Sequence, residues 1–141
     1  MHGRRLSSAG DGWPTVEPFA RIPVACSPDE ISAVVSGIFA ELVEARSEPV
    51  HQVDEFLGFV GGVDWRTLFT QSLLVTVELT PTTGDVKVWA HEGRQRSDIF
   101  VSPPIDSPIT SNLQWGADLG SAVLAALYRS STTGWVGPYP E

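Results

Sequence analysis

Two stretches of alternating apolar and polar residues, separated by a turn sequence, most strongly constrain what this chain can fold into. They are residues 72–80 and 86–91, and Pro81-Thr82-Thr83-Gly84-Asp85 lies between them. Because successive side chains of a strand point to opposite faces, the alternation predicts a β-hairpin with one apolar face. That face, which needs an apolar cover, would carry Leu73, Val75, Val77, Leu79, Val86, Val88 and Ala90.

A helix that can supply this cover is predicted after Ser27-Pro28-Asp29-Glu30. The serine and the glutamate three residues later form a capping box, and proline suits the first helical position. Since Pro49 prevents much continuation, the helix is expected over about 28–46. The residues that recur at the spacing of one helical stripe, and that should face the hairpin, are Ile31, Val34, Val35, Ile38, Phe39, Leu42 and Val43.

A second helix is predicted over about 118–129, with Asp118 or Ser121 as its cap. Residues 98–102 are expected to add a third strand to the hairpin, and residues 103–112 to form a proline-punctuated loop.

The segments around the first helix carry weaker patterns. Residues 19–25, which contain Pro23, are interpreted as an edge strand. Residues 53–60 are interpreted as a strand that ends at Gly61-Gly62. Residues 64–70 fit either a strand or a helical turn.

This order of strand, helix, meandering strands and helix predicts an α+β fold with two layers. We expect a mostly antiparallel sheet of about four to five strands and two main helices, at about 28–46 and 118–129. A chain of 141 residues is the size of one domain. That domain is expected over 19–130, between a flexible N-terminal arm at 1–18 and an aromatic, proline-rich tail at 131–141.

The charge balance narrows the choice of partner. The formal net charge is −8, from 17 acidic and 9 basic residues, and the basic residues are scattered. Nucleic-acid binding draws on clustered Lys and Arg, so no nucleic-acid partner is expected, whereas a basic partner could be steered toward the chain. The single cysteine, the lack of a signal-peptide core and the lack of a long apolar run favour a soluble, cytoplasmic protein without a membrane partner.

The residue types that carry chemistry form no recognisable motif. The three histidines and Cys26 are not at metal-ligand spacing, so neither a metal nor a cofactor is expected. Cys26 precedes the first helix, where the helix dipole could activate its thiol, but packing as a small apolar residue is favoured. His91, Glu92 and Asp98 are the best acid-base cluster in the chain, although ordinary solvated charge is the favoured explanation of these residues.

The second face of the hairpin is the most informative surface. Leu74 and Trp89, joined by Phe100, would form an apolar patch edged by Glu78, Lys87 and His91. If both helices pack on one side of the sheet, the patch remains in water and indicates an interaction surface. If the helices lie on opposite sides, the same residues belong to the core. Both interpretations remain open from the sequence.

Two hypotheses for function follow. The first is a non-catalytic protein that binds another protein, or a second copy of itself, through this sheet face or an acidic edge. The alternative is a small enzyme or small-molecule-binding protein with a pocket between helices and sheet near His91. In size, acidity and element order, residues 20–130 resemble the small α+β immunity proteins of bacterial toxin systems and secretion-chaperone-like modules, which implies the first hypothesis.

Overall fold

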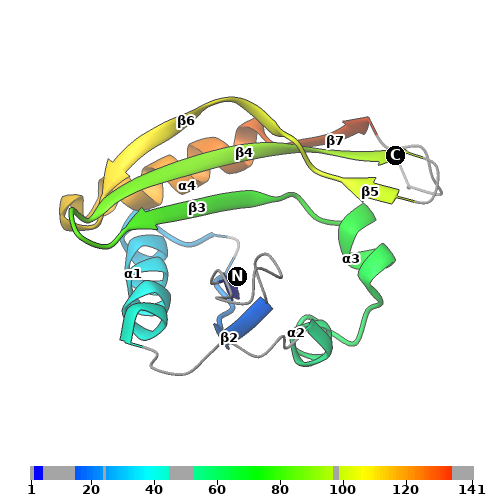
Figure 1. Cartoon of the computed structure of the whole chain (residues 1–141), viewed down its shortest axis with the longest axis horizontal. Coiled ribbons are helices and arrows are strands. Elements are labelled where there is room, and N and C mark those ends of the chain that lie inside the picture. The colour runs from blue at the N-terminus through cyan, green and yellow to red at the C-terminus, as the bar shows by residue number, and fades with distance from the viewer. Residues whose placement is uncertain (1, 5–14, 24, 45–52, 97–98, 135–141) are drawn as a thin grey trace.

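The computed structural model of the protein describes residues 2–4, 15–23, 25–44, 53–96 and 99–134. Its fold is α+β, as predicted (Figure 1). The helices are α1 (Pro28–Glu44), α2 (Val53–Phe59), α3 (Trp65–Thr70) and α4 (Ala117–Arg129), with a short 3-10 turn η1 (Leu113–Trp115). The strands are β1 (His2–Arg4), β2 (Thr15–Phe19), β3 (Val75–Thr80), β4 (Asp85–Arg96), β5 (Ile99–Val101), β6 (Pro104–Asn112) and β7 (Ser131–Gly134).

Strand β4 is the centre of the main sheet. Its first half pairs antiparallel with both β3 and β6, which therefore lie on its two edges. Its second half pairs antiparallel with β5 and parallel with β7. The predicted hairpin is confirmed, because Val75 pairs with Ala90, Val77 with Val88 and Leu79 with Val86. The expected sheet of four to five strands is not matched closely, since three antiparallel strands form its body and two short strands extend it.

The apolar face of the hairpin is the core of the protein. Val86, Val88 and Ala90 are buried there, with Val75, Val77 and Leu79 partly buried beside them. Helix α4 lies directly against this face, as Figure 1 shows, and contributes Leu119, Ala122 and Ala126. Leu73, which was expected on the same face, precedes β3 and is exposed.

Helix α1 begins as predicted. The Ser27 backbone N–H donates to the Glu30 carboxylate at 2.6 Å, and the Glu30 N–H donates to Ser27 Oγ at 3.2 Å, so the capping box is closed. Ile31, Val35, Ile38 and Leu42 are buried, but Val43 is exposed, so its place in the predicted stripe is wrong. Residues 45–46 lie outside the described residues.

Helix α1 packs mainly along α4 rather than across the sheet. Ile31 and Val35 from its first half belong to the core cluster of the hairpin, and Phe39 packs against that cluster. Ile38 and Leu42 instead form a second cluster with Ala20, Val34 and Phe39. Both α1 and α4 therefore lie on the Val86–Val88 side of the sheet.

The contact between α1 and α4 is closest at Gly120. A Cβ placed there would lie 1.8 Å from the Pro28 carbonyl oxygen, so only glycine fits. The same contact caps α4: Ser32 Oγ donates to the Gly116 carbonyl at 2.6 Å and accepts from the Gly120 N–H at 2.8 Å. The predicted caps Asp118 and Ser121 are wrong, because α4 begins at Ala117 after Gly116 and is capped from another helix.

Residues 53–60, interpreted as a strand, and residues 64–70, left undecided between a strand and a helical turn, both contain helices. Residues 53–60 contain α2, because Asp54 and Glu55 suit the first turn of a helix and Phe56 is its buried side chain. Gly61 and Gly62, both with positive φ, end it. In residues 64–70, Asp64 caps α3 by accepting from the Thr67 N–H at 2.6 Å. The described residues thus contain four α-helices instead of two main ones.

The segment interpreted as a loop, residues 103–112, is mostly strand β6. Pro104 is the first residue of this strand, where a missing N–H is tolerated. The register jumps from Val88–Ile109 to Ala90–Ile105, so residues 106–108 bulge opposite Trp89 and accommodate Pro108. Asp106 has a φ of 55° in this bulge.

The edge strand predicted at residues 19–25 is also misplaced. Strand β2 ends at Phe19 and pairs with β1, whereas the described residues beyond it form an irregular segment with a Cys26 N–H to Pro23 carbonyl bond. Residues 5–14 and 135–141 of the expected arm and tail lie outside the described residues, so the division into arm, domain and tail stays a prediction.

Gly120→Ala is expected to destabilise the protein by about 3 kcal/mol or more, because its methyl group meets helix backbone that has no room to yield. Gly37→Ala is the matched control, since Gly37 lies inside α1 and a Cβ there meets nothing within 4 Å. Gly37→Ala should raise the free energy of unfolding by about 0.5–1 kcal/mol, because alanine favours a helix interior over glycine. Urea unfolding followed by circular dichroism measures both changes, and equal effects would contradict the close approach.

The capping box makes stability depend on pH. The Ser27 backbone N–H and then its side chain hold the pKa of Glu30 below the usual 4.5. Since the folded pKa is the lower one, Glu30 stabilises the fold above its unfolded pKa and loses this effect as the pH falls through the folded pKa. Glu30→Gln should therefore flatten the fall of stability between about pH 5 and pH 3, measured by urea unfolding at each pH. A slope that Glu30→Gln leaves unchanged would contradict this role of the capping box.

Candidate functional site

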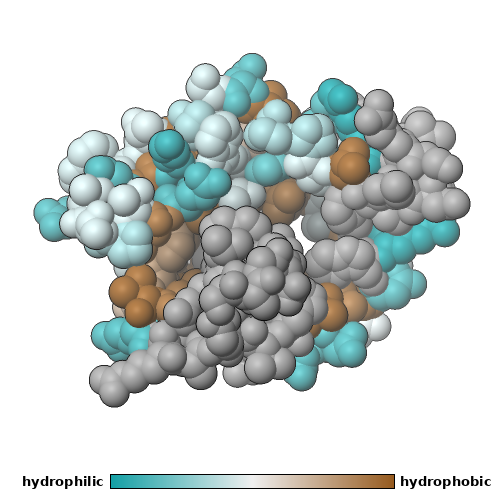
Figure 2. Space-filling view, in the orientation of Figure 1, coloured by the Kyte–Doolittle hydropathy of each residue, from teal (hydrophilic) through white to brown (hydrophobic). Residues whose placement is uncertain are grey.

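The face of the sheet opposite α4 is called here the outer face. It carries Thr76, Glu78, Lys87, Trp89, His91 and Thr110, because these alternate with the core residues along β3, β4 and β6. Since α1 and α4 both pack on the other face, neither covers it, which is the arrangement required by the interaction-surface interpretation. Figure 2 shows that the surface over these strands is mostly pale or teal, with few brown residues, so it is mixed rather than strongly apolar.

Trp89 is the large side chain of the outer face. It is half-buried, and its indole Nε1 is buried without a hydrogen-bond partner in the described part of the chain. A buried donor left unpaired costs about 1–3 kcal/mol. Leu74, just before β3, is 41% exposed, and Lys87 and Glu78 pair across the two strands. The Phe100 side chain lies outside the described residues, so its part in the patch stays a prediction.

His91 is held by the fold at both ring nitrogens. Nδ1 lies 2.6 Å from the Ser102 carbonyl, which only accepts, so Nδ1 carries the proton. Nε2 lies 2.7 Å from Thr76 Oγ1 on the neighbouring strand. The His91 backbone N–H donates to Ser130 Oγ, which donates in turn to the Leu74 carbonyl at 2.9 Å. The ring therefore ties β4 to β3 and to the segment before β6.

The rest of the predicted acid-base cluster does not meet His91 among the described residues. Glu92 accepts from Arg94 at 2.6 Å, and Asp98 lies outside the described residues. Cys26 is half-buried against the core, as its packing interpretation expects. Within the described residues, no three histidine, cysteine or acidic side chains come together as a metal site would require.

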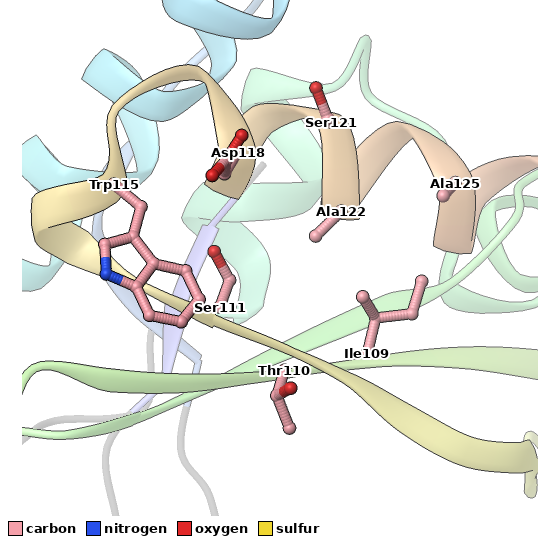
Figure 3. A pocket seen from close by; sticks show the side chains of 8 residues that line it. All are labelled: Ile109, Thr110, Ser111, Trp115, Asp118, Ser121, Ala122 and Ala125. Carbon is pink, nitrogen blue, oxygen red and sulfur yellow. The ribbon is translucent and has the colours of Figure 1, made fainter.

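A groove that the sequence did not indicate runs between β6 and α4 (Figure 3). We call it the β6–α4 groove; its volume is about 350 Å³. Its polar members are Thr110, Ser111, Asp118 and Ser121, its aromatic member is Trp115, and its apolar members are Ile109, Ala122 and Ala125. The early signals were Asp118 and Ser121, which sequence reasoning assigned to helix capping.

Two side chains of the groove are unusual. Ser111 is 4% exposed, yet its Oγ has no hydrogen-bond partner among the described residues. Trp115, in the turn η1, is 55% exposed in spite of its size. Figure 3 shows the Ser111 hydroxyl directed from β6 toward the first turn of α4, with the Trp115 ring beside it. These features are typical of a site that a ligand completes.

Comparison with known proteins adds no further guidance: the chain matches no family model, no curated protein and no solved structure. Of the helices that the structure describes, none has the length and apolar character needed to cross a membrane.

His91→Phe is expected to destabilise the protein by about 1–3 kcal/mol, because the Ser102 carbonyl and the Thr76 hydroxyl lose their partner. Lys87→Gln, an exposed change on the same strand, is the control and should alter stability by less than about 0.5 kcal/mol. Thermal unfolding of both variants measures the difference. A fully stable His91→Phe protein would contradict the structural role of the ring.

Proposed function

We propose that the protein is a non-catalytic binding protein that uses the outer face to bind another, positively charged protein in the cytoplasm. The observation that carries this proposal is the placement of α1 and α4 on one side of the sheet, which leaves Leu74 and Trp89 on a side that neither helix covers. Exposed apolar side chains around a half-buried tryptophan are frequent at the centre of protein interfaces.

The bulge of β6 beside Trp89 supports a binding role for the outer face. The bulge at residues 106–108 lies opposite Trp89 and interrupts the strand pairing there. Bulges of this kind often adjoin binding sites, where they redirect a neighbouring side chain.

Charge favours a basic partner over a second copy of this chain. Helix α1 contains Asp29, Glu30, Glu41 and Glu44 and no basic residue. Two copies with a formal charge of −8 each would repel one another as they approach, whereas a basic protein would be attracted. The same charge and the scattered basic residues argue against a nucleic-acid partner.

The enzyme hypothesis gains no support from these contacts. Both ring nitrogens of His91 are engaged within the fold, and Glu92 is paired with Arg94. The β6–α4 groove is lined by other residues and does not include His91.

The proposal is tested by selecting a library of random linear peptides against the protein. Peptides rich in Lys and Arg should be enriched, and Trp89→Ser should weaken their binding by about tenfold or more, because tryptophans at interface centres contribute strongly. Leu74→Ser, at an exposed position, should weaken binding without affecting the fold. Isothermal titration calorimetry measures the affinities.

Tyr128→Ser is the matched control, since Tyr128 is an aromatic side chain on α4 that is 83% exposed. It should leave peptide binding unchanged. Binding that is insensitive to Trp89 and Leu74, or selected peptides without basic residues, would overturn the proposal. So would a dimer of the wild-type protein in light scattering that Leu74→Ser converts to a monomer.

A further inference from the structure

We propose that the β6–α4 groove binds the guanidinium group of an arginine side chain presented by the partner protein. This inference rests on the proposed function and deepens it, because it names the side chain that the partner would contribute. The groove is separate from the outer face, but Thr110 belongs to both, since it pairs with Lys87 on β4 and also lines the groove.

The polar lining of the groove is complementary to a cation with many donors. Asp118 supplies a carboxylate, and Ser111 and Ser121 supply hydroxyl oxygens that can accept hydrogen bonds, whereas the Thr110 side chain lies on the outer face. The carboxylate of Asp118 makes no ion pair or hydrogen bond within the described part of the chain. No basic side chain lines the groove. An anionic ligand is therefore disfavoured, and a guanidinium, which has five donors and no acceptor, is favoured.

The Ser111 hydroxyl is independent evidence that the groove takes a ligand with a hydrogen-bonding group. Its side chain is almost completely buried, its hydroxyl has no described partner, and Figure 3 shows that hydroxyl directed into the space below Asp118. Buried hydroxyls in folded proteins are nearly always hydrogen-bonded. A ligand that places an N–H at the floor of the groove would complete the site.

Trp115 distinguishes arginine from other cations. Its ring forms one wall of the groove beside Asp118 and is more than half exposed, so a ligand can reach it (Figure 3). A planar guanidinium stacks on an indole while its edge donates to a carboxylate, whereas the ammonium of lysine is a compact, more strongly hydrated charge. The small side chains Ala122 and Ala125 leave room for the methylene stem of the arginine.

The experiment uses N-acetyl-L-arginine methylamide as the probe and its citrulline analogue as the uncharged, nearly isosteric control. Both are titrated into the full chain at physiological ionic strength, and amide chemical shifts are followed by NMR. The arginine probe should shift the amides around Ser111 and Asp118 saturably, with an affinity on the order of millimolar, as expected for one side chain. The citrulline probe should shift them little.

Three variants locate the site. Asp118→Asn should weaken binding of the arginine probe by about fivefold or more. Asp29→Asn is the matched control, because Asp29 is also the second residue of its helix and the charge change is identical. It should leave binding unchanged. Ser111→Ala should weaken binding while leaving stability equal or higher, since it removes a hydroxyl that the free protein does not satisfy.

Three outcomes would overturn the inference: equal effects of Asp118→Asn and Asp29→Asn, equal binding of the citrulline probe, or tighter binding of N-acetyl-L-lysine methylamide or of a neutral oligosaccharide at the groove. Leu74→Ser separates this inference from the proposed function. If that variant weakens the selected peptides while arginine fails to bind the groove, the outer face remains the interface and only the groove assignment falls. If arginine binds the groove but peptide binding does not depend on Leu74 or Trp89, the groove assignment stands and the outer face is not the interface.

Discussion

The contact between α1 and α4 at Gly120 determines how the rest of the protein is arranged. Ser32 satisfies backbone groups at both sides of the first turn of α4, and the missing side chain at Gly120 lets the Pro28 backbone approach it. Because α1 and α4 are joined there, both helices lie on one face of the sheet, and α4 fills the position that α1 was expected to occupy. That neither α1 nor α4 covers the outer face is thus a consequence of one helix-helix contact.

The elements with strong local patterns were predictable from the sequence. The capping box at Ser27 and the alternation around Pro81–Asp85 each combine a periodic apolar pattern with a specific start or turn signal, and both appear as expected. Strand β6 was missed because its prolines are signals of a loop, and they are tolerated only because one lies at the start of the strand and one in a bulge. Helix α2 was missed because seven residues carry too little periodicity to separate a helix from a strand.

The candidate sites were predictable to a smaller extent. The faces of β3 and β4 follow from alternation, so the outer-face position of Trp89 could be inferred, although whether helices cover it depends on tertiary packing. The β6–α4 groove had no sequence signal, because it joins a strand that was interpreted as a loop to a helix whose Asp118 was interpreted as a cap. The unpartnered Ser111 hydroxyl is a property of packing that no single-sequence pattern contains.

Among the described strands, β3, β5, β6 and β7 each pair with β4, and this affects the order in which the sheet folds. The β3–β4 hairpin forms from neighbouring residues, so it can close quickly and early. Strand β7 follows α4 and pairs parallel to β4, so it can join only after that helix has crossed the sheet. Strand β5, close in sequence, can pair early with residues 94–96, so the edge of Glu92 and Arg94 that receives β7 is filled last. In nascent or partly opened molecules this edge of β4 is where mispairing with another chain would begin.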